Sequence, residues 1–240
     1  MSARLHCLKT SMETRTDIQL DHIRFCYGEV CAVHDASFSL PTHTLTVLVG
    51  PNGGGKSTLI KMITGLTKPD AGRITFRKGL ETGYIPQNFA FDTAFPLTVE
   101  DLVLQGTLPR TIRPFSRYSA SQRGKARQAI AQVGLKGFER RGIGQLSGGQ
   151  LKRAVIARVF ASDVNLIALD EPDAGLDVDA AKELLEILNN MKHQKTIVLA
   201  SHNLNHVFSI ADQALYVNQS IQTFASPREL QDKLKGGISL

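Results

Sequence analysis

Short apolar runs and longer helical patterns alternate along this chain. A first helix is predicted after residue 56, and it ends at Gly65 with Pro69 just beyond as a stop signal. Apolar residues at helical spacing also predict helices within 98–162 and at 178–192. Apolar strands that alternate with helices are buried on both faces, so the pattern predicts an α/β fold with a covered, largely parallel sheet and a helical insertion. Strand-type runs are predicted at about 17–25, 36–40, 45–49, 73–77, 82–85, 165–169 and 196–200.

The chain has 240 residues, enough for one large domain or for a domain with an inserted lobe. We interpret the polar residues 1–16 as a poorly ordered leader and 17–240 as the folded domain, with a helical subdomain at about 90–162. No stretch approaches the ~18 apolar residues of a membrane helix. The first residues also lack the apolar segment of a secretory signal. We therefore expect a protein of the cytoplasm or of the cytoplasmic face of a membrane.

Much of the formal net charge of +6 comes from one basic run. The simplest interpretation of this run is a solvated loop and helix face, and the second is contact with a membrane-embedded partner or with anionic lipid. No nucleic-acid recognition module accompanies the charges, so a nucleic-acid partner is not expected. The basic run consists of Arg110, Arg113, Arg117, Arg123, Lys125 and Arg127.

The chain contains three cysteines, Cys7, Cys26 and Cys31. Their number is odd and no pair has CxxC spacing, so neither a disulfide framework nor a cysteine zinc site is indicated. We therefore predict that they are reduced thiols.

Residues 50–58 satisfy the phosphate-loop pattern GxxxxGK[ST] and directly follow the predicted strand 45–49. A glycine loop between a buried strand and a helix points backbone N–H groups at one spot, where a nucleotide phosphate fits. Four glycines are expected to take positive φ and to approach the phosphates closely. Lys56 supplies a point charge for the β and γ phosphates, and Ser57 offers its hydroxyl to Mg²⁺. The predicted loop residues are Gly50, Pro51, Asn52, Gly53, Gly54, Gly55, Lys56, Ser57 and Thr58.

Two adjacent carboxylates end the predicted strand 165–169, at the sheet edge where ligands bind in open α/β folds. We assign Asp170 to Mg²⁺ binding through water and Glu171 to activation of the attacking water as general base. Pro172 favours an extended backbone at Glu171. His202 follows the strand 196–200 at the same edge, which favours contact with the γ-phosphate, whereas His206 adds only weak evidence for a metal pair.

Leu146-Ser147-Gly148-Gly149-Gln150 opens a predicted helix at about 150–162. Locally this is a capping box, with Ser147 as N-cap and Gln150 at the third helical position. Each glycine disfavours the helix by ~1 kcal/mol relative to alanine, and capping alone does not require them. A glycine-lined helix start is a second anion site, so we predict a head-to-tail pair in which Ser147, Gly148, Gly149 and Gln150 of one chain close over the nucleotide of the other.

Together these motifs resemble the ATP-binding subunit of ABC transporters, over about residues 17–230. The resemblance implies a phosphate-loop NTPase core of ABC type with an antiparallel β subdomain and an inserted α-helical subdomain. It implies ATP and Mg²⁺ as cofactors, Tyr27 stacking on adenine, Gln87 sensing Mg²⁺ and the membrane partner, and His202 as switch histidine. Residues 146–150 match the family's signature segment and 174–177 its D-loop. Gly54 stands where alanine is commoner, a change that we expect to be harmless.

The same resemblance implies an ATPase that works as a homodimer on the cytoplasmic face of the cell membrane, bound to integral membrane permease subunits and, through them, to a solute-binding protein. Only 91 positions separate Lys56 from Ser147, too few for the coiled-coil arms of chromosome and DNA-repair members. Residues 91–103 resemble the corresponding segment in importers of zinc, manganese or chelated iron. We therefore predict a subunit that powers import of a metal ion, zinc or manganese first. An iron-chelate importer and a non-transport ABC-type ATPase are the alternatives.

Overall fold

We describe residues 15–87, 95–109 and 117–235 of a computed structural model, with the backbone alone at 204–205. The predicted leader lies outside these residues except at its last two positions, as do Arg110, Arg113 and residues 91–94. Among the described helices, none has the length and apolar character needed to cross a membrane. The elements are β1 (Thr16–Tyr27), β2 (Val30–Pro41), β3 (Leu45–Val49), α1 (Lys56–Ile63), β4 (Ala71–Phe76), β5 (Thr82–Ile85), α2 (Val99–Leu104), η1 (Gln105–Thr107), α3 (Ala120–Gln132), η2 (Ile143–Gln145), α4 (Gly148–Phe160), β6 (Leu166–Asp170), α5 (Val178–Met191), β7 (Thr196–Ala200), α6 (Leu204–Ile210), β8 (Gln213–Asn218), β9 (Ser220–Phe224) and α7 (Pro227–Lys235).

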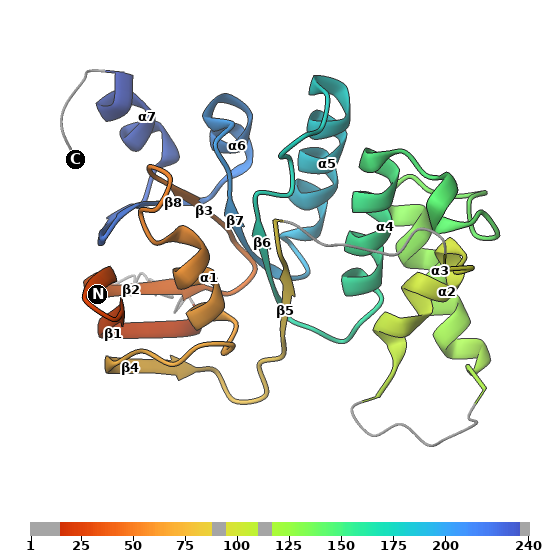
Figure 1. Cartoon of the computed structure of the whole chain (residues 1–240), viewed down its shortest axis with the longest axis horizontal. Helices are drawn as coiled ribbons and strands as arrows, with labels where there is room; N and C mark the ends of the chain where they lie inside the picture. The colour runs from red at the N-terminus through yellow and green to blue at the C-terminus, as the bar shows by residue number, and fades with distance from the viewer. Residues whose placement is uncertain (1–14, 88–94, 110–116, 236–240) are drawn as a thin grey trace, which may run out of the picture.

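Two sheets organise the fold (Figure 1). The larger has six strands in the order β5-β6-β7-β3-β8-β9, all parallel except for β9, which pairs antiparallel with β8. The smaller is antiparallel, in the order β2-β1-β4. The predicted class is confirmed, including the largely parallel core and the antiparallel subdomain.

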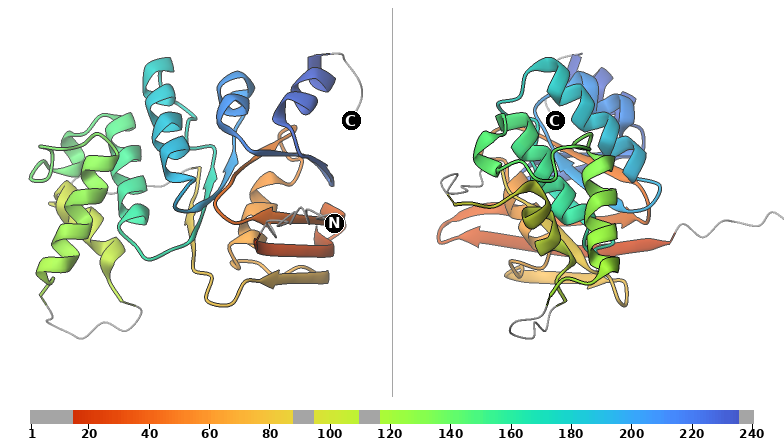
Figure 2. Two further views of the ribbon diagram at one scale, coloured as in Figure 1. Left: turned by 180° about the vertical axis from the view of Figure 1, so that it is seen from behind. Right: turned by 90° about the vertical axis from the view of Figure 1, so that its right-hand side faces the viewer.

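The six-stranded sheet is covered on both faces, as its continuous apolar strands require. Leu48 on β3 packs in a core shared with α1 and the antiparallel sheet, while its neighbours Val47 and Val49 belong to the core on the opposite face. α1 thus lies between the two sheets, and α5, α6 and α7 cover the far face (Figure 2). This arrangement places the carboxyl ends of β3, β6 and β7 beside the start of α1.

The helices α2, α3 and α4 form a group at one end of the long axis of the molecule, between β5 and β6 in sequence (Figures 1 and 2). Capping boxes start α2 at Thr98 and α3 at Ser119. In the described part of the basic run, Lys125 pairs with Asp163 at 2.7 Å and Arg127 with Glu100 at 3.2 Å. These pairs favour the interpretation of the run as a solvated face.

The antiparallel sheet is larger than the sequence pattern predicts, since β2 begins at Val30 and not near residue 36. The register of β1 against β2 shifts at several points, among them the step from Leu20 to Ile23. His22 and Asp35 take positive φ values of 49° and 40° in this region. Bulges of this kind interrupt the two-residue alternation on which the sequence prediction depends.

Asp17 joins the antiparallel sheet to the larger one. Its side chain is 1 % exposed. The carboxylate accepts hydrogen bonds from Thr42 Oγ1 at 3.1 Å, Arg77 Nε at 2.6 Å and Thr196 Oγ1 on β7 at 2.5 Å. A buried carboxylate with three donors from separate segments fixes the relative position of the two sheets.

We expect Asp17→Asn to lower the free energy of unfolding by about 3 kcal/mol, because it removes the charge that Arg77 pairs with and leaves donors unsatisfied. Urea unfolding without nucleotide measures the change. Asp21→Asn is the matched control, since Asp21 is exposed on the same strand and accepts a bond from Gln19. Equal stability of the two variants would show that Asp17 does not connect the sheets energetically.

Candidate active site

The loop between β3 and α1 approaches other backbone segments too closely for side chains at Gly50, Gly54 and Gly55. Gly50 has φ 150°, and a Cβ there would lie 2.0 Å from the carbonyl oxygen of Val217 on β8. Gly55, the N-cap of α1, has φ 102°, and a Cβ would lie 2.2 Å from the carbonyl oxygen of Ala32 on β2. The backbone of the loop is therefore packed closely between β2 and β8.

Gly54 corrects two sequence-based expectations. It does not have the positive φ expected for all four loop glycines. A Cβ at Gly54 would lie 2.6 Å from the carbonyl oxygen of Val217, so the glycine in place of alanine is needed for this close packing and is not a neutral change.

A cavity of about 560 Å³ opens over the loop and the start of α1. It brings together predicted residues from separate parts of the chain. Those lining it are Tyr27, Asn52, Gly53, Gly55, Lys56, Ser57, Thr58, Gln87, Glu171 and His202. Four residues that sequence reasoning missed also line it, namely Val30, Cys31, Ala32 and Gln219.

Gln219 illustrates why these residues were missed. It sits in the turn between β8 and β9 with φ 59°, donates its N–H to the Gly54 carbonyl at 2.9 Å, and accepts a bond from His34 N–H at 2.6 Å. Its place at the cavity comes from the pairing of β8 with β3, which no local pattern reveals.

Lys56 is 5 % exposed and closes the loop on itself. Its Nζ donates to the carbonyl oxygens of Gly50 and Pro51, both at 2.9 Å. Burial lowers the pKa of Lys56, while the charges of Glu171 and Asp170 oppose this shift. The ammonium group is thus held at the cavity, where phosphate oxygens can replace the two carbonyls as partners.

Asp170 lies below the cavity at the end of β6, 3 % exposed. Burial raises the pKa of Asp170, and a hydrogen bond with Ser57 counteracts this. Its Oδ1 is buried without a hydrogen-bond partner. A cation-bound water can satisfy this carboxylate oxygen, and Ser57 supplies a hydroxyl beside Asp170, so the residues fit Mg²⁺.

The described residues contain no group of three or more His, Cys, Asp or Glu side chains that could hold a metal ion by itself. Mg²⁺ itself takes one or two protein oxygens together with waters and substrate phosphates.

Glu171 is held by the two other predicted catalytic residues. Gln87 Nε2 donates to its Oε2 at 2.7 Å, and His202 Nε2 lies 2.6 Å from its Oε1. The three side chains come from segments that follow β5, β6 and β7, which are neighbours in the sheet. The carboxylate is therefore oriented at the cavity wall, where it can accept a proton from a water molecule.

The backbone of Glu171 is left-handed, with φ 48°, so the extended conformation expected from Pro172 is wrong. The N–H of Glu171 donates to the Ala200 carbonyl at 2.9 Å, and its carbonyl accepts from Ala174 N–H at 3.1 Å. The chain thus pairs with β7 and turns sharply in the same residue, which outweighs the local effect of the proline.

The signature segment lies in a different cavity, of about 530 Å³, which it shares with D-loop residues Gly175, Leu176 and Asp177. The predicted capping box is confirmed: Ser147 Oγ accepts from Gln150 N–H at 3.2 Å, and Gln150 Oε1 accepts from Ser147 N–H at 3.1 Å. Within one chain, the signature residues Ser147, Gly148, Gly149 and Gln150 do not reach the phosphate loop at 50–58. The signature segment and the phosphate loop therefore form separate surfaces.

Lys152 connects this segment to the D-loop, since its Nζ donates to the carbonyl oxygen of Ala174. Burial lowers the pKa of Lys152, and the charge of Asp173 opposes this shift. Ser201 Oγ in turn donates to Asp173 Oδ2 at 2.8 Å. These bonds join the signature helix to the segments beside Glu171 and His202.

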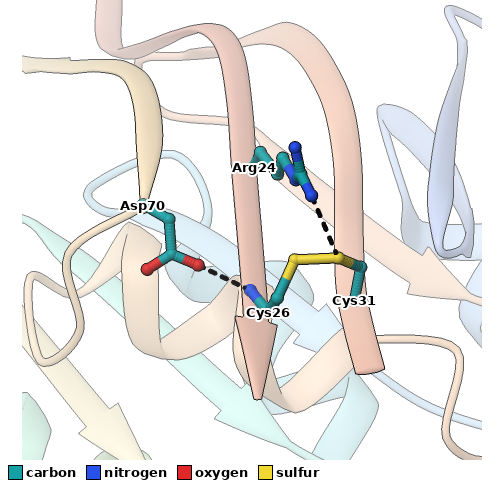
Figure 3. Close-up of a disulfide and its surroundings, with 4 residues drawn as sticks. All are labelled: Arg24, Cys26, Cys31 and Asp70. Carbon is teal, nitrogen blue, oxygen red and sulfur yellow. Dashed lines mark hydrogen bonds between the residues drawn. A yellow bond between two sulfur atoms is a disulfide. The ribbon is translucent and has the colours of Figure 1, made fainter. Parts of the chain in front are cut away.

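The prediction that the cysteines are reduced thiols is wrong for Cys26 and Cys31, which form a disulfide (Figure 3). The hairpin of β1 and β2 pairs residue 26 with residue 31, and their Cα atoms are 3.8 Å apart. Rules based on cysteine count and CxxC spacing do not detect cross-strand neighbours. Cys7 lies outside the described residues.

Residues 33–174 match the family model of the ABC transporter. The chain is 36% identical over 218 residues to a chelated iron transport system membrane protein of Yersinia pestis, covering 86% of this chain and 73% of that protein. It is 34% identical over 213 residues to a manganese transport system ATP-binding protein of Listeria innocua, covering 85% and 88%. A solved ABC transporter in an inward-facing conformation matches with a TM-score of 0.79 and 29% identity, covering 90% of this chain and 85% of that chain.

Proposed function

We propose that this chain, which belongs to the ABC transporter family and is an ATP-hydrolysing subunit, powers the import of a metal ion, with zinc or manganese favoured over chelated iron. The observation that carries the ATPase part is the contact of Gln87 and His202 with Glu171 at the wall of the phosphate-loop cavity. Relatives named for manganese, zinc and chelated iron transport support a metal cargo.

In this proposal each side chain has one task in hydrolysis. Lys56 exchanges its two carbonyl partners for the β and γ phosphates, and Glu171 takes a proton from the attacking water. Gln87 and His202 orient the carboxylate. Mg²⁺, held by Ser57, Gln87 and, through water, Asp170, would neutralise the charge that develops on the phosphate oxygens.

In this proposal a second copy of the chain supplies the contact that closes over the bound ATP. The separation of the signature segment from the phosphate loop supports a head-to-tail homodimer in which Ser147, Gly148 and Gly149 of one copy close over the ATP of the other. A helix start with two glycines offers free N–H groups to the γ-phosphate. Closure of the dimer is the step that couples hydrolysis to the permease.

Cassettes of this family work as dimers together with membrane permeases. We place this chain on the cytoplasmic face of the membrane, with Gln87 and the α2–α4 group towards the permease and a solute-binding protein delivering the metal on the other side. Gln87 lies two residues after β5 and before α2 in the sequence, and it contacts Glu171, which supports this route of coupling.

A transport assay in cells tests the cargo. In a strain that lacks the gene, uptake of radioactive manganese, zinc and chelated iron is measured before and after complementation with the wild-type chain or with Glu171→Gln. We expect the wild-type chain to restore uptake of manganese or zinc and Glu171→Gln not to restore it. Restoration of none of the three metals would reject metal import, and stimulation of ATP hydrolysis by DNA or RNA would then favour the non-transport alternative.

A further inference from the structure

The disulfide of Cys26 and Cys31 closes the turn that carries Tyr27. β1 ends at Tyr27 and β2 begins at Val30, so the cross-link lies at the base of the turn formed by residues 27–30. Both cysteines are half-buried, which leaves them within reach of small reagents. Cys31 also lines the phosphate-loop cavity, together with Tyr27 and Val30.

The two cysteines have different surroundings (Figure 3). Arg24 Nη2 donates to the sulfur of Cys31 at 3.8 Å, so a thiolate at Cys31 would have a cation beside it. The backbone N–H of Cys26 donates to Asp70 Oδ2 at 2.7 Å, which anchors this strand to the loop before β4. Cys31 is therefore the sulfur better suited to act as nucleophile, and Cys26 is the one held in place.

Tyr27 connects the cross-link to the nucleotide. Its ring packs edge-on against Phe25 with centroids 4.9 Å apart, and its hydroxyl lies 3.4 Å from Thr58 Oγ1 in the cavity. The side chain is nevertheless 55 % exposed, so one part of the ring remains available to a base. A change in the freedom of the 27–30 turn would change the position of this ring.

We propose that Cys26 and Cys31 form a thiol–disulfide exchange site that reacts with low-molecular-weight disulfides, and that its redox state sets the affinity of the cavity for adenine nucleotides. The second half of this proposal rests on the proposed contact of Tyr27 with adenine. Disulfides in reducing compartments are mostly transient or redox-sensing, which agrees with a site that opens and closes.

The exchange uses glutathione disulfide or a similar compound as oxidant. The Cys31 thiolate attacks one sulfur of glutathione disulfide, the S–S bond breaks, and one glutathione thiolate leaves. The Cys26 thiolate then attacks the Cys31 sulfur of the mixed disulfide and releases the second glutathione. Two protein thiols have lost two electrons and two protons, and one glutathione disulfide has become two glutathione molecules. Reduced glutathione in excess reverses both steps.

Oxidation is expected to strengthen nucleotide binding, because the cross-link holds the turn and presents Tyr27 in one position. In the reduced chain the turn must be ordered when the base binds, and this costs affinity. Oxidation is expected to change the binding of the adenine base and not that of the phosphates, because the phosphates contact the loop at 50–58. Tripolyphosphate, which lacks a base, should therefore bind equally well in both redox states.

The test uses the full-length wild-type chain equilibrated at defined ratios of reduced to oxidised glutathione. Alkylation followed by mass spectrometry measures the oxidised fraction of Cys26 and Cys31, and calorimetry measures the affinity for ADP and for tripolyphosphate. We expect the oxidised chain to bind ADP about three- to ten-fold more tightly than the reduced chain, and tripolyphosphate equally in both states. Cysteines that stay reduced in excess glutathione disulfide, or equal ADP affinity in both states, would overturn the proposal.

Variants separate this proposal from the adenine contact. Cys26→Ser should bind ADP like the reduced wild type under all conditions, whereas Cys7→Ser should keep the redox response. Tyr27→Ala should bind ADP more weakly and lose the difference between redox states. If Tyr27→Ala binds ADP like the wild type in both states, the adenine contact fails. If Tyr27→Ala binds ADP more weakly while the wild type binds ADP equally well in both redox states, only the exchange proposal fails.

Discussion

Replacement of Glu171 by glutamine is expected to slow ATP hydrolysis about 10²- to 10⁴-fold, the usual contribution of a general base. This corresponds to roughly 3 to 5 kcal/mol of activation free energy. The amide has the shape of the carboxylate and can still accept the bond from Gln87, but it cannot take up a proton from water. Nucleotide affinity should therefore change little, and the ATP-bound dimer should persist.

Single-turnover phosphate release measures the chemical step, and gel filtration with ATP measures the dimer. Glu186→Gln is the matched control, because it makes the same change at an exposed position on α5. Hydrolysis at a near-normal rate in Glu171→Gln would remove Glu171 from the role of general base. A variant that stays monomeric with ATP, both alone and with its permease, would contradict the shared nucleotide site.

The sequence was sufficient for the parts of the site that depend on local patterns. The phosphate loop, the strand that ends at Asp170 and the capping box at Ser147 are each encoded within a few consecutive residues, and parallel strands bring their carboxyl ends to one edge. The pattern at 50–58 could therefore be placed beside Asp170 and His202 without a structure.

Features that depend on pairing between distant segments could not be predicted in this way. The left-handed backbone of Glu171 depends on its bond to Ala200, and the Cys26–Cys31 disulfide depends on the register of a bulged hairpin. The buried carboxylate of Asp17 could not be distinguished in the sequence from an exposed acidic residue, because its partners lie up to 179 positions away. Each of these features requires the tertiary structure.

Lys56→Ala is expected to weaken ATP binding at least about 100-fold, from the loss of charge-assisted bonds to two phosphate groups at roughly 1.5 to 3 kcal/mol each. The ammonium group is already desolvated at the cavity and bonded to Gly50 and Pro51, so it does not have to be ordered when ATP binds. Calorimetry with ATP measures the loss. This phenotype differs from that of Glu171→Gln, which binds ATP and fails to hydrolyse it.

Two further variants identify the cause of that loss. Lys68→Ala removes the same group from an exposed position just beyond α1 and should leave affinity unchanged. Lys56→Arg keeps the charge but replaces a compact ammonium by a planar guanidinium, which cannot donate to the Gly50 and Pro51 carbonyls in the same geometry. If charge alone mattered, Lys56→Arg would bind ATP like the wild type. We expect it to remain at least about ten-fold weaker, because a guanidinium cannot take the position of the buried ammonium, which is 5 % exposed and bonded to two carbonyl oxygens.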